Sequence, residues 1–227
     1  MNHLIIGGSS ALGRVVVKQL SARGDAIVAT SRMPEPDQVL CDVTSENQVA
    51  DAIATATARL GSLDSVIYLP GFSADGSSTS LATELMVTSL EINTIGAFRV
   101  AREALRAAGT HPCALTFVGT TNALRGVAGQ AAYTAGKAAL LGLARSLAGE
   151  FGPRGHRINV VAPGYIDGGL TVGLTPRNRE QIERIIPLRR FADMEEIANV
   201  IAFVASSKST YLNGAVIYAD GGLAMGH

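Results

Sequence analysis

Tyr133 and Lys137 are the two side chains whose types and spacing best suit proton-transfer chemistry. They stand four residues apart in a small-residue stretch that predicts a helix, so they would share one helix face. A free tyrosine has a pKa of about 10, too high for an efficient base at neutral pH. A neighbouring ammonium group favours the phenolate, so we expect Lys137 to lower the pKa of Tyr133. A core tyrosine and a solvated lysine at this spacing by chance is the alternative.

A glycine-rich turn follows the first apolar run of the chain. Residues 7–13 read GGSSALG, after the run 4–6 and before a helix pattern that continues to Leu20. Such a turn brings the backbone close to a pyrophosphate, whose charge the helix N-terminus stabilises. We therefore expect the turn to bind a dinucleotide through the following residues: Gly7, Ser9, Ser10, Leu12 and Gly13. Glycine turns also occur at plain strand–helix corners, so the flanking strand and helix strengthen this prediction.

The end of the second apolar run predicts the type of dinucleotide. An acidic side chain at this position binds the ribose hydroxyls of NAD, whereas an arginine accepts the 2′-phosphate of NADP. Residues 29–32 read ATSR, without an acid. Ser31 and the planar guanidinium of Arg32 suit a phosphate, so we expect NADP(H) in preference to NAD(H). A solvated surface arginine is the alternative.

The elements that must position these residues follow from the alternation of short apolar runs with helix-period stretches. Strands are expected at 4–6, 26–29, 39–40, 65–69, 114–118, 157–162 and 215–219, and helices up to Leu20 and at 47–60, 81–108, 130–151 and 194–206. This order predicts an α/β fold in which about seven strands form a doubly wound parallel sheet (a Rossmann fold) with helices on both faces. We expect one domain over 1–227. The long connection 164–190 is expected to be a substrate lid, with a plain surface excursion as the alternative.

Composition excludes several other classes of protein. The sequence is 47% hydrophobic and 17% charged, with equal numbers of acidic and basic residues, which favours a packed globular protein without nucleic-acid or membrane partners. No apolar run approaches the ~18 residues of a membrane span, and no signal peptide is evident, so a cytoplasmic location is expected. Cys41 and Cys113 are far apart, which suits a reducing compartment. The scattered His3, His111, His156 and His227 predict no metal site.

Together with Asn93, these motifs resemble the short-chain dehydrogenase/reductase family over nearly the whole length. Five segments in the family's order carry the resemblance: CDVT at 41–44, EINT at 91–94, GQAAYTAGK at 129–137, RINVVAPG at 157–164, and the pair NG at 213–214 with DGG at 220–222. The resemblance implies that Tyr133 and Lys137 act with Asn93, which would support a water relay. Counting back by the family's spacing places its catalytic serine at Thr120, which keeps the hydroxyl and adds a methyl group.

The resemblance also implies further contacts to the dinucleotide. They involve Asp42 and Val43 at the adenine ring, Gly71 after the fourth strand, Lys137 and Tyr133 at the nicotinamide ribose, and Pro163, Gly164 and Ile166 beside the nicotinamide.

Several positions depart from the family's usual sequence. Ile6 and Ala11 replace a threonine and a glycine of its first motif, and residues 68–71 read YLPG where relatives have NNAG. The short connection from Arg32 to Val39 predicts a more open adenine side of the cleft. Gly168 replaces a threonine that contacts the nicotinamide amide, a contact for which Thr171 is a substitute.

The resemblance implies an NADP(H)-dependent carbonyl reductase or alcohol dehydrogenase. Apolar residues within 165–190 predict a partly apolar pocket for a small carbonyl or alcohol substrate, with reduction as the favoured direction. A nucleotide-binding sensor or scaffold with little turnover is the first alternative, and an isomerase or lyase with tightly held cofactor is another. The helices at 81–108 and 130–151 pair between subunits in relatives, so a homotetramer, or otherwise a dimer, is expected.

Overall fold

The computed structural model describes residues 1–225; His227, one of the four histidines considered above, lies outside them. Seven parallel strands form one sheet in the order β3-β2-β1-β4-β5-β6-β7. The strands are β1 (Asn2–Ile6), β2 (Ala26–Ser31), β3 (Val39–Leu40), β4 (Ser65–Tyr68), β5 (Ala114–Val118), β6 (Arg157–Pro163) and β7 (Val216–Ala219). The predicted parallel Rossmann sheet is confirmed. The strand order reverses between β1 and β4, and ligands of open α/β sheets bind at the carboxyl side of such a switch point.

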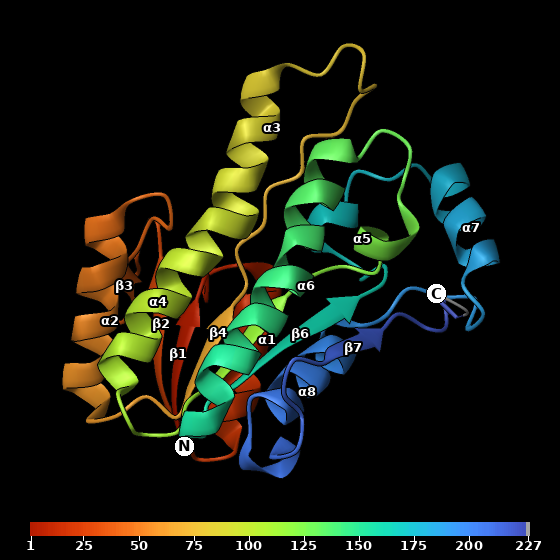
Figure 1. The fold of residues 1–227 in the computed structure, drawn as a ribbon. Helices are drawn as coiled ribbons and strands as arrows, with labels where there is room; N and C mark the ends of the chain where they lie inside the picture. The colour runs from red at the N-terminus through yellow and green to blue at the C-terminus, as the bar shows by residue number, and fades with distance from the viewer. Residues whose placement is uncertain (226–227) are drawn as a thin grey trace.

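Helices cover both faces of this sheet (Figure 1). On one face lie α2 (Glu46–Leu60), α4 (Gly96–Ala108) and α6 (Ala131–Phe151), and on the other lie α1 (Ala11–Ala22) and α8 (Met194–Val204). Alternation along β1 explains the two cores: Leu4 and Ile6 pack toward the first group of helices, whereas Ile5 packs toward α1 and α8. The strands are therefore buried on both faces, as their continuous apolar runs predict.

Shorter elements gather at the carboxyl end of the sheet. Figure 1 shows α3 (Thr83–Leu90), α5 (Asn122–Arg125) and α7 (Pro176–Ile185) at the end toward which the strand arrows point. The helix predicted over 81–108 is divided by a π-helical turn, η1 (Glu91–Ile95), and α5 was not predicted. Three 3-10 turns complete the described elements: η2 (Gly152–Arg154), η3 (Gly169–Thr171) and η4 (Ser207–Ser209). The segment 164–190 thus contains η3 and α7, and its action as a lid stays a prediction.

None of the helices described over residues 1–225 combines the length and the apolar character that crossing a lipid bilayer requires.

Candidate active site

A cleft of about 900 Å³ opens at the carboxyl end of the sheet, along the switch point between β1 and β4. It runs from the glycine turn after β1, past the ends of β4 and β5, to the segment after β6. Nearly all the residues predicted for the site line it: Gly7, Ser9, Ser10, Leu12, Ser31, Arg32, Asp42, Val43, Gly71, Thr120, Tyr133, Lys137, Pro163, Gly164 and Ile166. The fold therefore brings together residues from seven separate segments.

The glycine turn has the backbone geometry that a phosphate site needs. Gly7 has a φ of +79°, which favours glycine, and its N–H donates to the hydroxyl of Thr30 at 3.2 Å. Ser10 caps α1 by accepting the N–H of Gly13 at 3.1 Å. A side chain at Gly13 would place its Cβ 2.5 Å from the carbonyl oxygen of Gly7. Gly13 does not line the cleft, so its predicted contribution is indirect: it lets α1 pack closely against the turn.

The adenine end of the cleft carries one exposed cation and one carboxylate. Arg32 is exposed at the end of β2, and Ser31 is held by the hydroxyl of Ser9 at 2.9 Å. The backbone N–H of Thr44 holds the pKa of Asp42 below its usual range, and the charge of Arg32 adds to this effect. The guanidinium is thus close enough to Asp42 to interact with it, yet stays open to solvent. Residues 32–37 of the short connection from Arg32 to Val39 are exposed, and a more open adenine side of the cleft stays a prediction.

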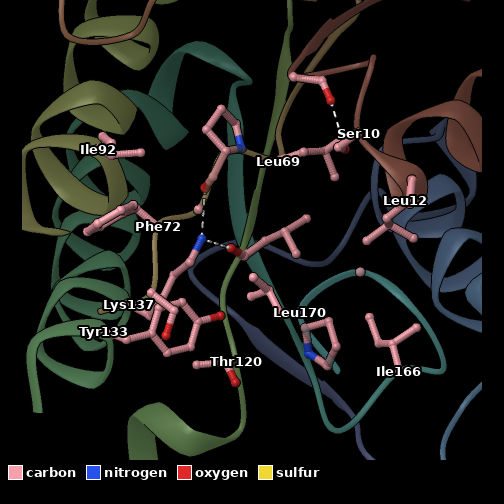
Figure 2. A pocket seen from close by; sticks show the side chains of 18 of the residues that line it. Ser10, Leu12, Leu69, Phe72, Ile92, Thr120, Tyr133, Lys137, Ile166 and Leu170 are labelled. Atoms are coloured by element: carbon pink, nitrogen blue, oxygen red, sulfur yellow. Dashed lines mark hydrogen bonds between the residues drawn. The ribbon is translucent and has the colours of Figure 1, made fainter. Parts of the chain in front are cut away.

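Lys137 is buried at the centre of the cleft. Its Nζ donates to the carbonyl oxygens of Pro70 at 2.9 Å and Val118 at 2.8 Å, contacts that Figure 2 shows as dashed lines. Burial lowers the pKa of Lys137 to about 7, whereas the two carbonyl acceptors favour the ammonium form. A Cβ at Gly71 would lie 3.3 Å from the same Nζ, so glycine keeps the approach to Lys137 clear.

Tyr133 and Thr120 lie together beside Lys137 (Figure 2). Burial raises the pKa of Tyr133 to about 12, an effect that the Thr120 hydroxyl reduces and the charge of Asp75 increases. The predicted lowering of this pKa by Lys137 is therefore wrong for the protein's own groups. The physical reason is that the phenol is desolvated, while the lysine nitrogen is directed at two backbone carbonyls instead. Thr121 is turned away from the cleft, toward the carbonyl of Ala162 and toward Asp220.

Asn93 does not line the cleft. It lies in the π-helical turn η1 and is fully buried. Its Oδ1 accepts the N–H of Phe72 at 3.1 Å, and its Nδ2 donates to the carbonyl of Phe72 at 2.8 Å and to Ser89 at 2.9 Å. These bonds use the amide group to fix the backbone at Phe72. The geometry therefore supports a positioning role for the Asn93 side chain, and the water relay stays a prediction.

Two departures from the family's usual sequence have local explanations. Gly168 has a φ of +107°, a backbone conformation that a threonine would adopt only with strain. Thr171 lines the cleft, and its hydroxyl bonds the carbonyl of Ile166 at 2.6 Å. After β4, the hydroxyl of Tyr68 donates to the carbonyl of Ile92 at 2.5 Å, tying the altered segment to η1.

Several residues of the cleft were not predicted from the sequence. On one wall they are polar and follow β4 and β5: Ser73, Asp75, Asn122 and Gln130. The others are mostly apolar: Phe72, Ile92 and Met194. Tyr165, Leu170 and Leu174 also line the cleft, and they belong to the segment 165–190 from which the partly apolar pocket was predicted. The carboxyl ends of parallel strands meet at one edge, so the segments after β4 and β5 carried a usable signal. Met194 carried none, because it reaches the cleft from the start of a helix distant in sequence.

The residues present fit a nicotinamide dinucleotide. The glycine turn and the α1 N-terminus suit the pyrophosphate, and the exposed guanidinium of Arg32 stands at the adenine end. At the centre of the cleft the Lys137 nitrogen faces Gly71, which has no side chain to block the approach of a ligand.

Comparisons with known proteins agree with this site. A family model described as "Enoyl-(Acyl carrier protein) reductase" matches residues 9–224. The chain is 34% identical to the 3-oxoacyl-[acyl-carrier-protein] reductase MabA of Mycobacterium tuberculosis, covering 99% of this chain and 93% of that protein. It is also 34% identical to carbonyl reductase family member 4 of Danio rerio, covering 97% and 96%.

A solved structure shares the fold over the same length. A short-chain dehydrogenase/reductase from Serratia marcescens superposes with a TM-score of 0.89 at 27% identity, covering 97% of this chain and 96% of that chain. The chain therefore belongs to the short-chain dehydrogenase/reductase family, as an oxidoreductase acting on the carbonyl–alcohol pair.

Proposed function

We propose that the protein is an NADP(H)-dependent reductase that converts a small, partly apolar ketone or aldehyde to an alcohol. The observation that carries the proposal is the convergence of Tyr133, Thr120 and Lys137 in the cleft at the switch point of the sheet. Apolar side chains that line the cleft, among them Tyr165, Leu170 and Leu174, suit a partly apolar substrate.

In this mechanism the protein binds the carbonyl oxygen and supplies its proton. When bound, the dinucleotide would provide the hydride that reduces the carbonyl carbon. Thr120 donates a hydrogen bond to the carbonyl oxygen, and Tyr133 transfers its phenolic proton to that oxygen as the alcohol forms. Lys137 binds the ribose hydroxyls and stabilises the phenolate left on Tyr133. The glycine turn and α1 hold the pyrophosphate, and Pro163, Gly164 and Ile166 line the nicotinamide end.

The protonation state of Tyr133 supports the reducing direction. Burial raises the pKa of its phenol to about 12, so the group carries its proton throughout the physiological pH range. A protonated phenol is an acid ready to donate to a carbonyl oxygen.

The test is NADPH and NADH oxidation measured against a broad panel of ketones and aldehydes. The wild type is expected to oxidise NADPH with part of the panel, and Tyr133→Phe to lose at least about a hundredfold in kcat, because the proton donor is removed. Tyr133→Phe should still bind NADPH by fluorescence titration, which separates lost chemistry from lost folding. A wild type that binds NADPH but turns over no carbonyl would contradict the proposal and favour a sensor.

We propose in addition that the protein forms a homotetramer or otherwise a dimer. Exposed apolar side chains on α3, η1 and α4 support this assembly, among them Val87, Ile95 and Phe98. Phe203 of α8 and Tyr218 of β7 provide a second exposed apolar region.

A further inference from the structure

A chain of polar side chains forms one wall of the cleft beside Thr120 and Tyr133. Asn122 Nδ2 donates to Gln130 Oε1 at 3.1 Å, and Gln130 Nε2 donates to Asp75 Oδ2 at 3.4 Å. Ser73 donates to the other oxygen of Asp75 at 2.6 Å. All four residues line the cleft. Every hydrogen bond of this chain thus points toward the Asp75 carboxylate, which becomes its terminal acceptor.

The polar chain is connected to the reacting groups. The backbone N–H of Asn122 donates to the Thr120 hydroxyl at 3.3 Å, and the negative charge of Asp75 acts on the phenol of Tyr133. The loop that carries Asp75 is fixed to the start of α6 by the N–H of Gly76, which donates to the carbonyl of Gly129 at 2.8 Å. Asp75 is therefore held near the place where a substituent of the carbonyl substrate would lie.

The polar chain of side chains still has hydrogen-bonding positions that no described residue fills. A carboxylate has about four lone-pair positions, and Asp75 uses two of them. Asn122 is only 8% exposed, yet over residues 1–225 its side-chain oxygen accepts no hydrogen bond. Asn122 lines the cleft, so this oxygen can accept a hydrogen bond from a ligand there.

We propose that Asp75, held by Gln130 and Ser73, is a specificity-determining residue that accepts a hydrogen bond from a substrate hydroxyl near the reacting carbonyl. This inference rests on the proposed reductase function and narrows its substrates to hydroxylated ketones and aldehydes whose remaining part is apolar. A hydroxyl suits this wall, because it donates to Asp75 and also accepts from the remaining amide protons of Gln130 or Asn122. A substrate carboxylate near this wall is disfavoured by the like charge of Asp75.

The test compares two ketones of equal size, 4-hydroxy-2-butanone and 2-pentanone, in which a hydroxyl replaces a methyl group. The wild type is expected to prefer the hydroxyketone in kcat/KM by about tenfold, the effect of one charge-assisted hydrogen bond at an exposed carboxylate. Asp75→Leu should lose this preference, and Asp75→Asn should retain part of it. Asp51→Leu removes an exposed carboxylate from α2, away from the cleft, and should leave the preference unchanged.

A second pair tests the charge of Asp75. Acetoacetate and its methyl ester differ by one negative charge, and Asp75→Asn should improve kcat/KM for acetoacetate relative to the ester. Equal kcat/KM for the two uncharged ketones in the wild type, or a preference that survives in Asp75→Leu, would overturn the inference while leaving the reductase function intact. A panel in which other carbonyls react but 4-hydroxy-2-butanone does not would also overturn it. A wild type without any carbonyl turnover would remove the proposed function, and this inference with it.

Discussion

Burial, and not the neighbouring charge, dominates the properties of the two central ionisable side chains. Desolvation raises the pKa of Tyr133 to about 12 and lowers the pKa of Lys137 to about 7. Both shifts disfavour the charged forms in the buried cleft. Spacing along α6 places the two residues on one face, but the carbonyl oxygens of Pro70 and Val118 decide where the lysine nitrogen points. The chemistry of each residue is therefore set by atoms contributed from other segments.

Arg32 carries the expected preference for NADP(H). Replacing it in Arg32→Ala should weaken NADPH binding by about ten- to a hundredfold, the loss of a charge-assisted phosphate contact, and leave NADH binding nearly unchanged. Fluorescence titration with both nucleotides measures the two dissociation constants. Arg23→Ala, at the distant end of α1, is the matched control. An equal loss of affinity for both nucleotides would show that Arg32 does not bind the 2′-phosphate.

At the scale of elements, the loops after β4 and β5 carry the polar wall of the cleft, and the segment after β6 carries much of its apolar lining. The π-helical turn η1 supports the loop after β4 through two of its residues. The Asn93 side chain bonds the backbone of Phe72, and the Ile92 carbonyl accepts a hydrogen bond from the Tyr68 hydroxyl. Gly96 begins α4 directly beneath this junction. A Cβ there would lie 2.7 Å from the Tyr68 hydroxyl oxygen and 2.8 Å from Val43 Cγ2, so close packing requires glycine.

Gly96→Ala should therefore lower the free energy of unfolding by about 1–3 kcal/mol, the usual cost of overpacking. The displaced Val43 should also weaken nucleotide binding. Gly142 in α6 is the matched control, since a Cβ there meets nothing within 4 Å. Gly142→Ala should raise stability by up to about 1 kcal/mol through helix propensity. Denaturant unfolding of both variants measures the effect, and a neutral Gly96→Ala would show that the junction is not tightly packed.

For the molecule as a whole, the buried lysine makes folding stability depend on pH. The pKa of Lys137 is about 7 in the folded chain, below its ordinary value, so between that pH and about 10 the unfolded chain binds more protons. The contribution of Lys137 to stability should then rise with pH across this window by at most about 1.4 kcal/mol per unit, and it should be constant below pH 7.

Lys137→Met should remove this part of the pH dependence, as measured by urea unfolding from about pH 7 to about pH 10. Lys18→Met, which replaces an exposed lysine of α1, should keep it. If the wild type and Lys137→Met show the same slope, the ammonium form is held by the carbonyls of Pro70 and Val118 despite burial.

Local sequence patterns predict the parallel sheet and most of the residues that line the cleft. Short apolar runs alternating with helix-period stretches predict buried parallel strands, and the glycine turn, Arg32 and the Tyr133–Lys137 spacing mark the binding edge. Helix boundaries were mostly right, although the π-helical turn at Asn93 and the helix α5 after β5 were not predicted.

The contacts and the burial of each side chain in the cleft follow from the tertiary structure and could not be predicted from local sequence patterns. In the folded chain the Asn93 side chain bonds the Phe72 backbone and does not line the cleft, and the Lys137 nitrogen donates to two backbone carbonyls. Burial raises the pKa of Tyr133, and Asp75, Gln130 and Asn122 form one series of hydrogen bonds. Some of the contacting residues lie far apart in sequence: Asp75 and Gln130 by 55 positions, and Lys137 and Pro70 by 67. Their contacts arise because the loops after parallel strands meet at one edge of the sheet, and desolvation and hydrogen bonding there depend on distance in space and not on distance along the chain.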